Sequence, residues 1–124
     1  ENEPAVAVIG ARECSEYGRF VAEELGRYLG SQGIQVISGM ARGIDGISQQ
    51  AALLAGGTSY GVLGCGVDIC YPRQNRKLYE ELIQKGGLLS TYAPGTKALP
   101  AYFPPRNCIV IVLADALIVK AARH

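Results

Sequence analysis

Apolar runs and helix-like periodicities alternate along the chain. Residues 5–10 (AVAVIG) are rich in valine and isoleucine and end at glycine, which is the pattern of a buried strand. From Ser15, a residue type that caps helices, to about Gln32, apolar residues such as Val21 and Leu25 recur at helical spacing. The chain therefore begins with a predicted strand and an amphipathic helix.

The same alternation continues through the middle of the chain. Further elements are predicted as strands at 34–38, 59–64 and 87–92, and as helices at 43–57 and 74–85. Strands that are separated by helical segments form right-handed βαβ units. The sequence therefore predicts an α/β fold with a doubly wound, mostly parallel sheet and helices on both faces, in a single domain over residues 1–124.

The C-terminal third is less regular. A connection at 93–105 holds four of the six prolines of the chain, which favours a loop. Residues 106–113 are apolar and fit a helix or a strand equally well, whereas residues 116–122 (ALIVKAA) fit a strand better. The pattern alone leaves the first of these two segments open.

Charge is nearly balanced, with 12 Lys and Arg against 11 Asp and Glu and a net charge of +1. Any binding of anions must therefore come from the local placement of cations. No run approaches the roughly 20 apolar residues of a membrane span, and the first residues lack the pattern of a signal peptide. We expect a cytoplasmic protein that makes no membrane contact.

The chain carries few of the motifs that mark catalytic or cofactor sites. Cys14, Cys65, Cys70 and Cys108 form neither a CxxC pair nor a Cys/His cluster, and the one histidine is His124. The sequence contains no GxSxG elbow and no GxxxxGK[ST] loop, and no GxGxxG follows the first strand. We therefore expect no metal, no cofactor and no catalytic residues.

Four arginines fall in the connections at the carboxyl ends of predicted strands, where open parallel sheets bind their ligands. They are Arg12 in GARECS, Arg42 in GMARGID, Arg73 after YP, and Arg106 in FPPRN. Most carboxylates lie on helices or at the N-terminus, so this edge can be positive in a nearly neutral chain. A loop arginine can equally be solvated or ion-paired, but four in matching positions predict a binding site for phosphates.

Glycines and aromatic residues surround these arginines. Gly10, Gly39 and Gly43 bracket strand ends where helix N-termini present unpaired N–H groups that suit phosphate. Phe103 and Tyr71 lie in the same connections and could stack on the bases of single-stranded nucleic acid. The alternative is that both rings only anchor loops on the sheet.

The stretch SGMARGID is the tightest of these turns. Gly39 and Gly43 allow the backbone to turn sharply out of the second strand, which would place Arg42 over the edge of the sheet. Asp45 stands in the first turn of the next helix, where the helix dipole favours an acid. We expect its carboxylate to hold Arg42 through a charge-assisted hydrogen bond.

Several motifs, in order, resemble the DNA-processing protein A (DprA/Smf) family. VAVIGAR looks like its first strand and Gly-x-Arg turn, ISGMARGIDGISQQAAL like its central signature, and VLGCGVDICYPRQN like its third strand and loop, while LLSTYAPGT and YFPPRN complete the series. The resemblance implies a Rossmann-like domain that binds single-stranded DNA, loads the RecA recombinase during natural transformation, dimerises and is not an enzyme. It places the family's basic pocket on Arg12, Arg42, Arg73 and Arg106.

Two other interpretations stay open at this stage. A nucleotide-phosphate-processing enzyme of the lysine-decarboxylase-like phosphoribohydrolase type would have a similar sheet, but its PGGxGT-xE motif is absent and APGTK is the nearest text. The second interpretation is a structural domain that has no binding site of its own and only supports a partner. The DprA/Smf pattern usually continues after the fifth strand, whereas this sequence ends at IVKAARH, so we expect a shortened or divergent C-terminal part.

Overall fold

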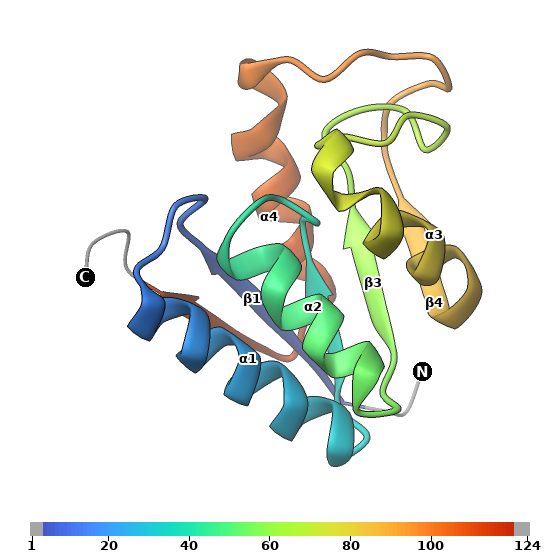
Figure 1. The fold of residues 1–124 in the computed structure, drawn as a ribbon. Coiled ribbons are helices and arrows are strands. Elements are labelled where there is room, and N and C mark those ends of the chain that lie inside the picture. Colours follow the sequence, from blue (N-terminus) through green and yellow to red (C-terminus); the bar gives the residue numbers. More distant parts are fainter. Residues whose placement is uncertain (1–3, 121–124) are drawn as a thin grey trace.

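A five-stranded parallel sheet forms the centre of the computed structural model, which describes residues 4–120 (Figure 1). The strands lie in the order β4-β3-β2-β1-β5, and each neighbouring pair is parallel. Their bounds are β1 (Ala5–Gly10), β2 (Gln35–Ser38), β3 (Ser59–Val62), β4 (Gly86–Leu89) and β5 (Ala116–Lys120). The predicted Rossmann-like α/β architecture is confirmed.

The helices divide three to one between the two faces of the sheet. They are α1 (Glu16–Ser31), α2 (Ile44–Leu54), α3 (Arg76–Lys85) and α4 (Phe103–Leu113). Strands β1 to β4 follow one another in one direction, so right-handed crossovers put α1, α2 and α3 on the same face. The chain then returns to the far side of β1, and α4 covers the opposite face (Figure 1).

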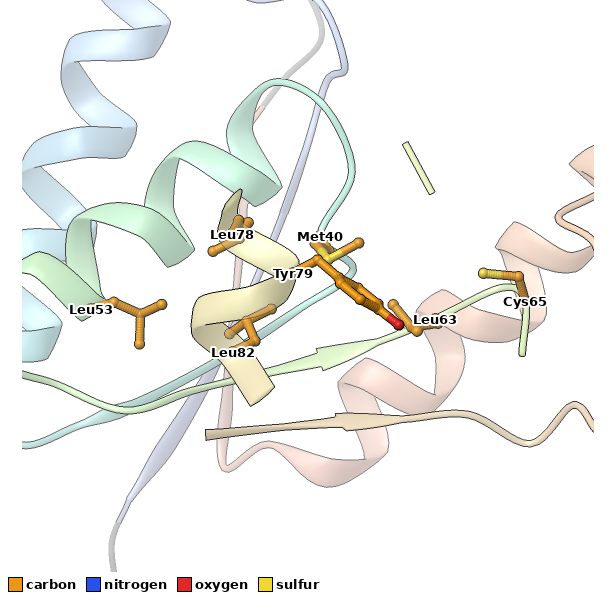
Figure 2. Close-up of a cluster of buried hydrophobic side chains, with 7 residues drawn as sticks. All are labelled: Met40, Leu53, Leu63, Cys65, Leu78, Tyr79 and Leu82. Atoms are coloured by element: carbon orange, nitrogen blue, oxygen red, sulfur yellow. The ribbon is translucent and has the colours of Figure 1, made fainter. Parts of the chain in front are cut away.

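Buried apolar side chains hold each layer to the sheet. The cluster in Figure 2 brings Leu78, Tyr79 and Leu82 of α3 against Met40 and Leu63, which follow β2 and β3. Separate clusters lie beneath α1 and α2, around Val8, Val36, Ile44 and Ala52, and beneath α4, around Ala7, Ile37, Val62 and Val110. The carboxyl ends of the strands are thus fixed from both faces.

Most predicted elements lie within a few residues of the observed ones. The ambiguous segment 106–113 belongs to helix α4, whose first turn contains Pro104 and Pro105, positions where the missing N–H costs little. The fourth strand spans 86–89 rather than 87–92, because the chain turns away from β3 after Leu89. Residues 121 and 122 of the predicted last strand lie outside the described part of the chain.

The helices of the described residues are also short. None of those between residues 4 and 120 combines the length and the apolar character that crossing a membrane would require.

Candidate nucleic-acid interface

A pocket of about 180 Å³ opens at the carboxyl ends of β1, β2 and β3. The predicted site residues that line it are Gly10, Arg12, Gly39, Arg42, Phe103 and Arg106. Gly43 lies beside it on a neighbouring groove. Arg73 is exposed in a 3-10 turn (Arg73–Asn75) directly after Pro72, a lining residue, but does not itself line the pocket. The fold therefore gathers three of the four arginines around one cavity.

Arg106 is the most buried cation of the pocket, with 5% of its surface exposed. Its Nη1 donates to the carbonyl oxygens of Gly39 at 2.8 Å and Val62 at 3.0 Å, and its Nε donates to Asn107 Oδ1 at 2.9 Å. A Cβ on Gly39 would overlap this guanidinium. Burial lowers the pKa of Arg106 from its usual value. Its cation therefore joins the ends of β2 and β3 and is only partly available to a ligand.

Asp45 is buried beneath the same pocket and joins β1 to β2. Its Oδ1 accepts from the amide of Gly10 and its Oδ2 from the amide of Gly39, each at 3.1 Å. Burial raises the pKa of Asp45, while the Gly10 amide and the charge of Arg106 act in the opposite direction. The amides of Gly10 and Gly39 themselves are therefore not open to phosphate, because an internal carboxylate already accepts from them.

Arg42 is held by a different acid from the one predicted. Its Nη2 lies 3.5 Å from Glu13 Oε2, and both side chains are exposed. Asp45 cannot reach outward to Arg42, since its two oxygens are turned to the strand ends beneath the loop. The predicted pairing of Asp45 with Arg42 is therefore wrong. An exposed pair of this kind contributes little stability, so Arg42 is free to exchange Glu13 for a ligand anion.

Two polar residues that the sequence reasoning missed shape the turn before Arg42. Gln49, fully buried on α2, accepts from the Met40 amide at 2.8 Å and donates to Ser59 Oγ at 2.9 Å. Asn75 donates to the Met40 carbonyl at 3.0 Å. Met40 itself has φ 58°, an unusual backbone for a side chain of its size. A polar residue one helical turn after Asp45, on the buried face, was the signal for Gln49.

Aromatic rings form one wall of the pocket. Tyr71 and Phe103 are stacked, with centroids 5.8 Å apart and planes inclined by 24°. Arg106 Cζ lies 5.1 Å from the centroid of Phe103, within the range of a cation–π contact. Phe103 is half-buried, while Tyr71 is 42% exposed. The pair combines a half-buried ring with one that is more exposed to solvent.

The charges of the pocket differ in availability. Arg12 is exposed and makes no ion pair with the described residues, and Arg42 makes one long, exposed pair. Within residues 4–120, no group of three or more His, Cys, Asp and Glu side chains is placed to hold a metal ion. The arrangement is thus two accessible cations and an aromatic pair over a rigid, hydrogen-bonded floor.

Comparison with known proteins fits this arrangement. The family model described as DNA recombination-mediator protein A matches residues 1–124. The chain belongs to that family. DNA processing protein DprA of Streptococcus pneumoniae is 38% identical over 120 residues, which are 97% of this chain and 42% of the relative. Protein Smf of Synechocystis is 35% identical over 119 residues, 96% of this chain and 30% of the relative.

Solved structures of the DNA recombination-mediator protein A family share the fold. The structure of DNA processing protein A from Helicobacter pylori, reported for its unique single-stranded DNA binding mode, superposes with a TM-score of 0.88 at 34% identity. The match covers 95% of this chain and 54% of that one. The chain spans less than half the length of the two curated relatives. The resemblance seen in the sequence motifs is confirmed.

Proposed function

We propose that this protein binds single-stranded DNA in the pocket at the carboxyl edge of its sheet and acts in DNA processing by binding rather than by catalysis. One observation carries the proposal: Arg12 and Arg42 are accessible beside the stacked rings of Tyr71 and Phe103. Cations that follow phosphates and rings that stack on bases are the two components of most single-strand binding sites.

The aromatic wall favours single-stranded over duplex DNA. Bases in a duplex are stacked on one another and paired, so their faces are covered, whereas unpaired bases can stack on a protein ring. Tyr71 offers such a ring at the mouth of the pocket, next to Phe103. The relative from Helicobacter pylori, similar over 95% of this chain, binds single-stranded DNA.

The site residues have different tasks in this proposal. Arg12 and Arg42 bind phosphates, and Arg73, exposed just beyond Pro72, extends the same path outside the pocket. Arg106 and Gly39 build the floor, because the guanidinium is already bonded to two backbone carbonyls. Gly43, with φ 80°, permits the turn that follows Arg42.

The wider role is proposed from the family. A DprA/Smf protein would load the RecA recombinase onto single-stranded DNA during natural transformation, as a homodimer in the cytoplasm. The matched region is less than half of the curated relatives DprA and Smf, so the activity and partners of the whole protein rest on this proposal.

A fluorescence-anisotropy titration with a labelled oligonucleotide tests the binding site. We expect Arg12→Ala and Arg42→Ala each to weaken binding about fivefold, since an exposed contact between unit charges is worth about 1 kcal/mol. Each should also make the slope of log K against log salt less steep by about 0.7, because one phosphate fewer is neutralised. An unlabelled duplex of the same sequence should compete poorly.

Arg76→Ala is the matched control for these variants. Arg76 is exposed, pairs with Glu80 on α3 and lines neither the pocket nor the neighbouring groove. This variant should bind like the parent. If Arg12→Ala and Arg42→Ala also bind like the parent, the pocket is not the DNA site.

A further inference from the structure

A second, larger cavity runs over the helical face of the protein. It is a groove of about 680 Å³, within the range of roughly 300–1,000 Å³ that is typical of ligand sites. Helix α2 forms its floor, and α1 and α3 lie on either side of α2 (Figure 1). None of the loop arginines except Arg42 belongs to it.

Small side chains make up part of the floor of the groove, at Gly43, Gly46 and Ala51. The floor residues follow helical spacing, at Gly43, Gly46, Ile47, Gln50, Ala51 and Leu54. A Cβ on Gly46 would lie 2.8 Å from Asn75 Nδ2, so this glycine also lets the start of α3 approach α2. The rest of the lining comes from side chains of α1 and from residues at the start of α3.

Those walls are positively charged. The charged side chains that line the groove are Arg19, Glu23, Arg27, Arg42 and Lys77. Four of the five are cations. The acids Glu16, Glu80 and Glu81 on the same helices do not line the groove, although Glu81 accepts from the floor residue Gln50 at 2.7 Å. Arg27 is paired with Glu24, but Arg19 and Lys77 are exposed and make no ion pair with the described residues. Two cations on opposite walls are therefore available to an anion.

Arg42 connects the groove to the pocket. It lines both cavities, and its one ion-pair partner among the described residues is the exposed Glu13 at 3.5 Å. If Arg42 holds one phosphate of a polymer, the neighbouring phosphates can therefore enter the groove and lie between Arg19 and Lys77. A monomeric anion would gain nothing from this continuity.

We propose that the groove between α1 and α3 is a second contact site for the phosphate backbone of the same single-stranded nucleic acid. This inference rests on the proposed function of the pocket. Among the described residues, no aromatic side chain lines the groove, so the bases should not be read there and contact should be made through phosphates. The apolar floor residues Ile47 and Leu54 would suit an acidic peptide helix as well, but the shared Arg42 favours the polynucleotide.

Oligonucleotide length separates the two sites. We would titrate the parent and the variant Arg19→Ala/Lys77→Ala with labelled oligothymidylates of about 4 and about 12 nucleotides, spanning the usual range of site sizes. The short oligonucleotide should bind both proteins equally, because it fills only the pocket. The long one should bind the variant less tightly, with a salt slope less steep by about 1.4, or about 0.7 for each lost phosphate contact.

Two controls keep charge and position apart. Arg19→Lys/Lys77→Arg keeps both charges and should retain the parental slope with the long oligonucleotide. Lys77→Ala should make the slope less steep by about 0.7, whereas Lys85→Ala, which removes the same charge from the same helix outside the groove, should not change it.

The outcomes distinguish this inference from the proposed function. A parental slope for Arg19→Ala/Lys77→Ala with the long oligonucleotide would overturn the groove site while leaving the pocket intact. Equal losses with both lengths would also overturn it, since the effect would then be that of overall charge. If the parent binds neither oligonucleotide, the proposed function itself fails.

Discussion

At the scale of one residue, Arg106 shows how a cation can support a binding site structurally without binding the ligand itself. Its guanidinium bonds to carbonyls at the ends of β2 and β3 and is attracted by the buried carboxylate of Asp45. Because Gly39 has no Cβ, it leaves room for the guanidinium of Arg106. Removing one partner of a buried charge pair leaves the other uncompensated, which costs far more than losing an exposed pair.

We predict that Arg106→Ala lowers the free energy of unfolding by about 3 to 5 kcal/mol, because Asp45 would stay buried without its countercharge. Urea denaturation of the parent and the variant measures this difference. Arg73→Ala is the control, since Arg73 is exposed and should change stability by less than about 0.5 kcal/mol. Equal stabilities for Arg106→Ala and the parent would show that Arg106 does not support the site structurally.

At the scale of elements, the close packing of α1 on α2 supports the edge of the sheet. Gly26 of α1 faces the backbone of Ser48 on α2, and a Cβ there would overlap the Ser48 carbonyl oxygen. Gly18, two turns earlier in α1, faces side chains and no backbone: a Cβ there would lie 3.1 Å from Cys14 Cβ, 3.6 Å from Ser15 Oγ and 3.9 Å from Ile44 Cδ1. The same substitution at these two glycines therefore separates helix propensity from helix packing.

We predict that Gly26→Ala is less stable than Gly18→Ala by about 1 to 3 kcal/mol in urea denaturation, which is the usual cost of overpacking. Both variants replace glycine with a better helix former, which is worth up to about 1 kcal/mol in a helix interior, so most of that contribution cancels. If the two variants unfold at the same urea concentration, the helices are not locked together at Gly26.

At the scale of the whole molecule, charge is distributed unevenly although its sum is only +1. Exposed cations gather at the carboxyl edge and in the groove on the helical face, and they include Arg12, Arg19, Arg42 and Lys77. Such a surface can hold a polyanion along a path without making the protein basic as a whole. A protein that presents extended single strands in this way would suit the loading of another protein onto them.

We predict that the protein shortens the lag of RecA filament assembly on single-stranded DNA, and that Arg12→Ala/Arg42→Ala does not. The lag depends on nucleation, which a bound mediator would assist only while it holds the DNA. Assembly can be followed by the fluorescence of a labelled oligonucleotide. An unchanged lag with a parent protein that does bind DNA would limit its role to binding.

Much of the fold could be predicted because burial leaves a local pattern. The run at 5–10 and the spacing of Val21 and Leu25 identify β1 and α1 almost residue by residue. The segment 106–113 could not be assigned in this way, because it is apolar nearly all round and its first turn contains no cap signal other than proline. Its packing beneath the sheet, through Val110, decides that it is a helix.

The sequence by itself determined the order of elements and brought four arginines to one edge, since parallel strands all end on the same side. Only the tertiary structure decided what each of them does. Asp45 bonds to Gly10, 35 residues away, and Arg106 to Gly39, 67 residues away. Such partners depend on which loops come together at the edge of the sheet. A local pattern of hydrophobic and polar positions does not predict these long-range contacts.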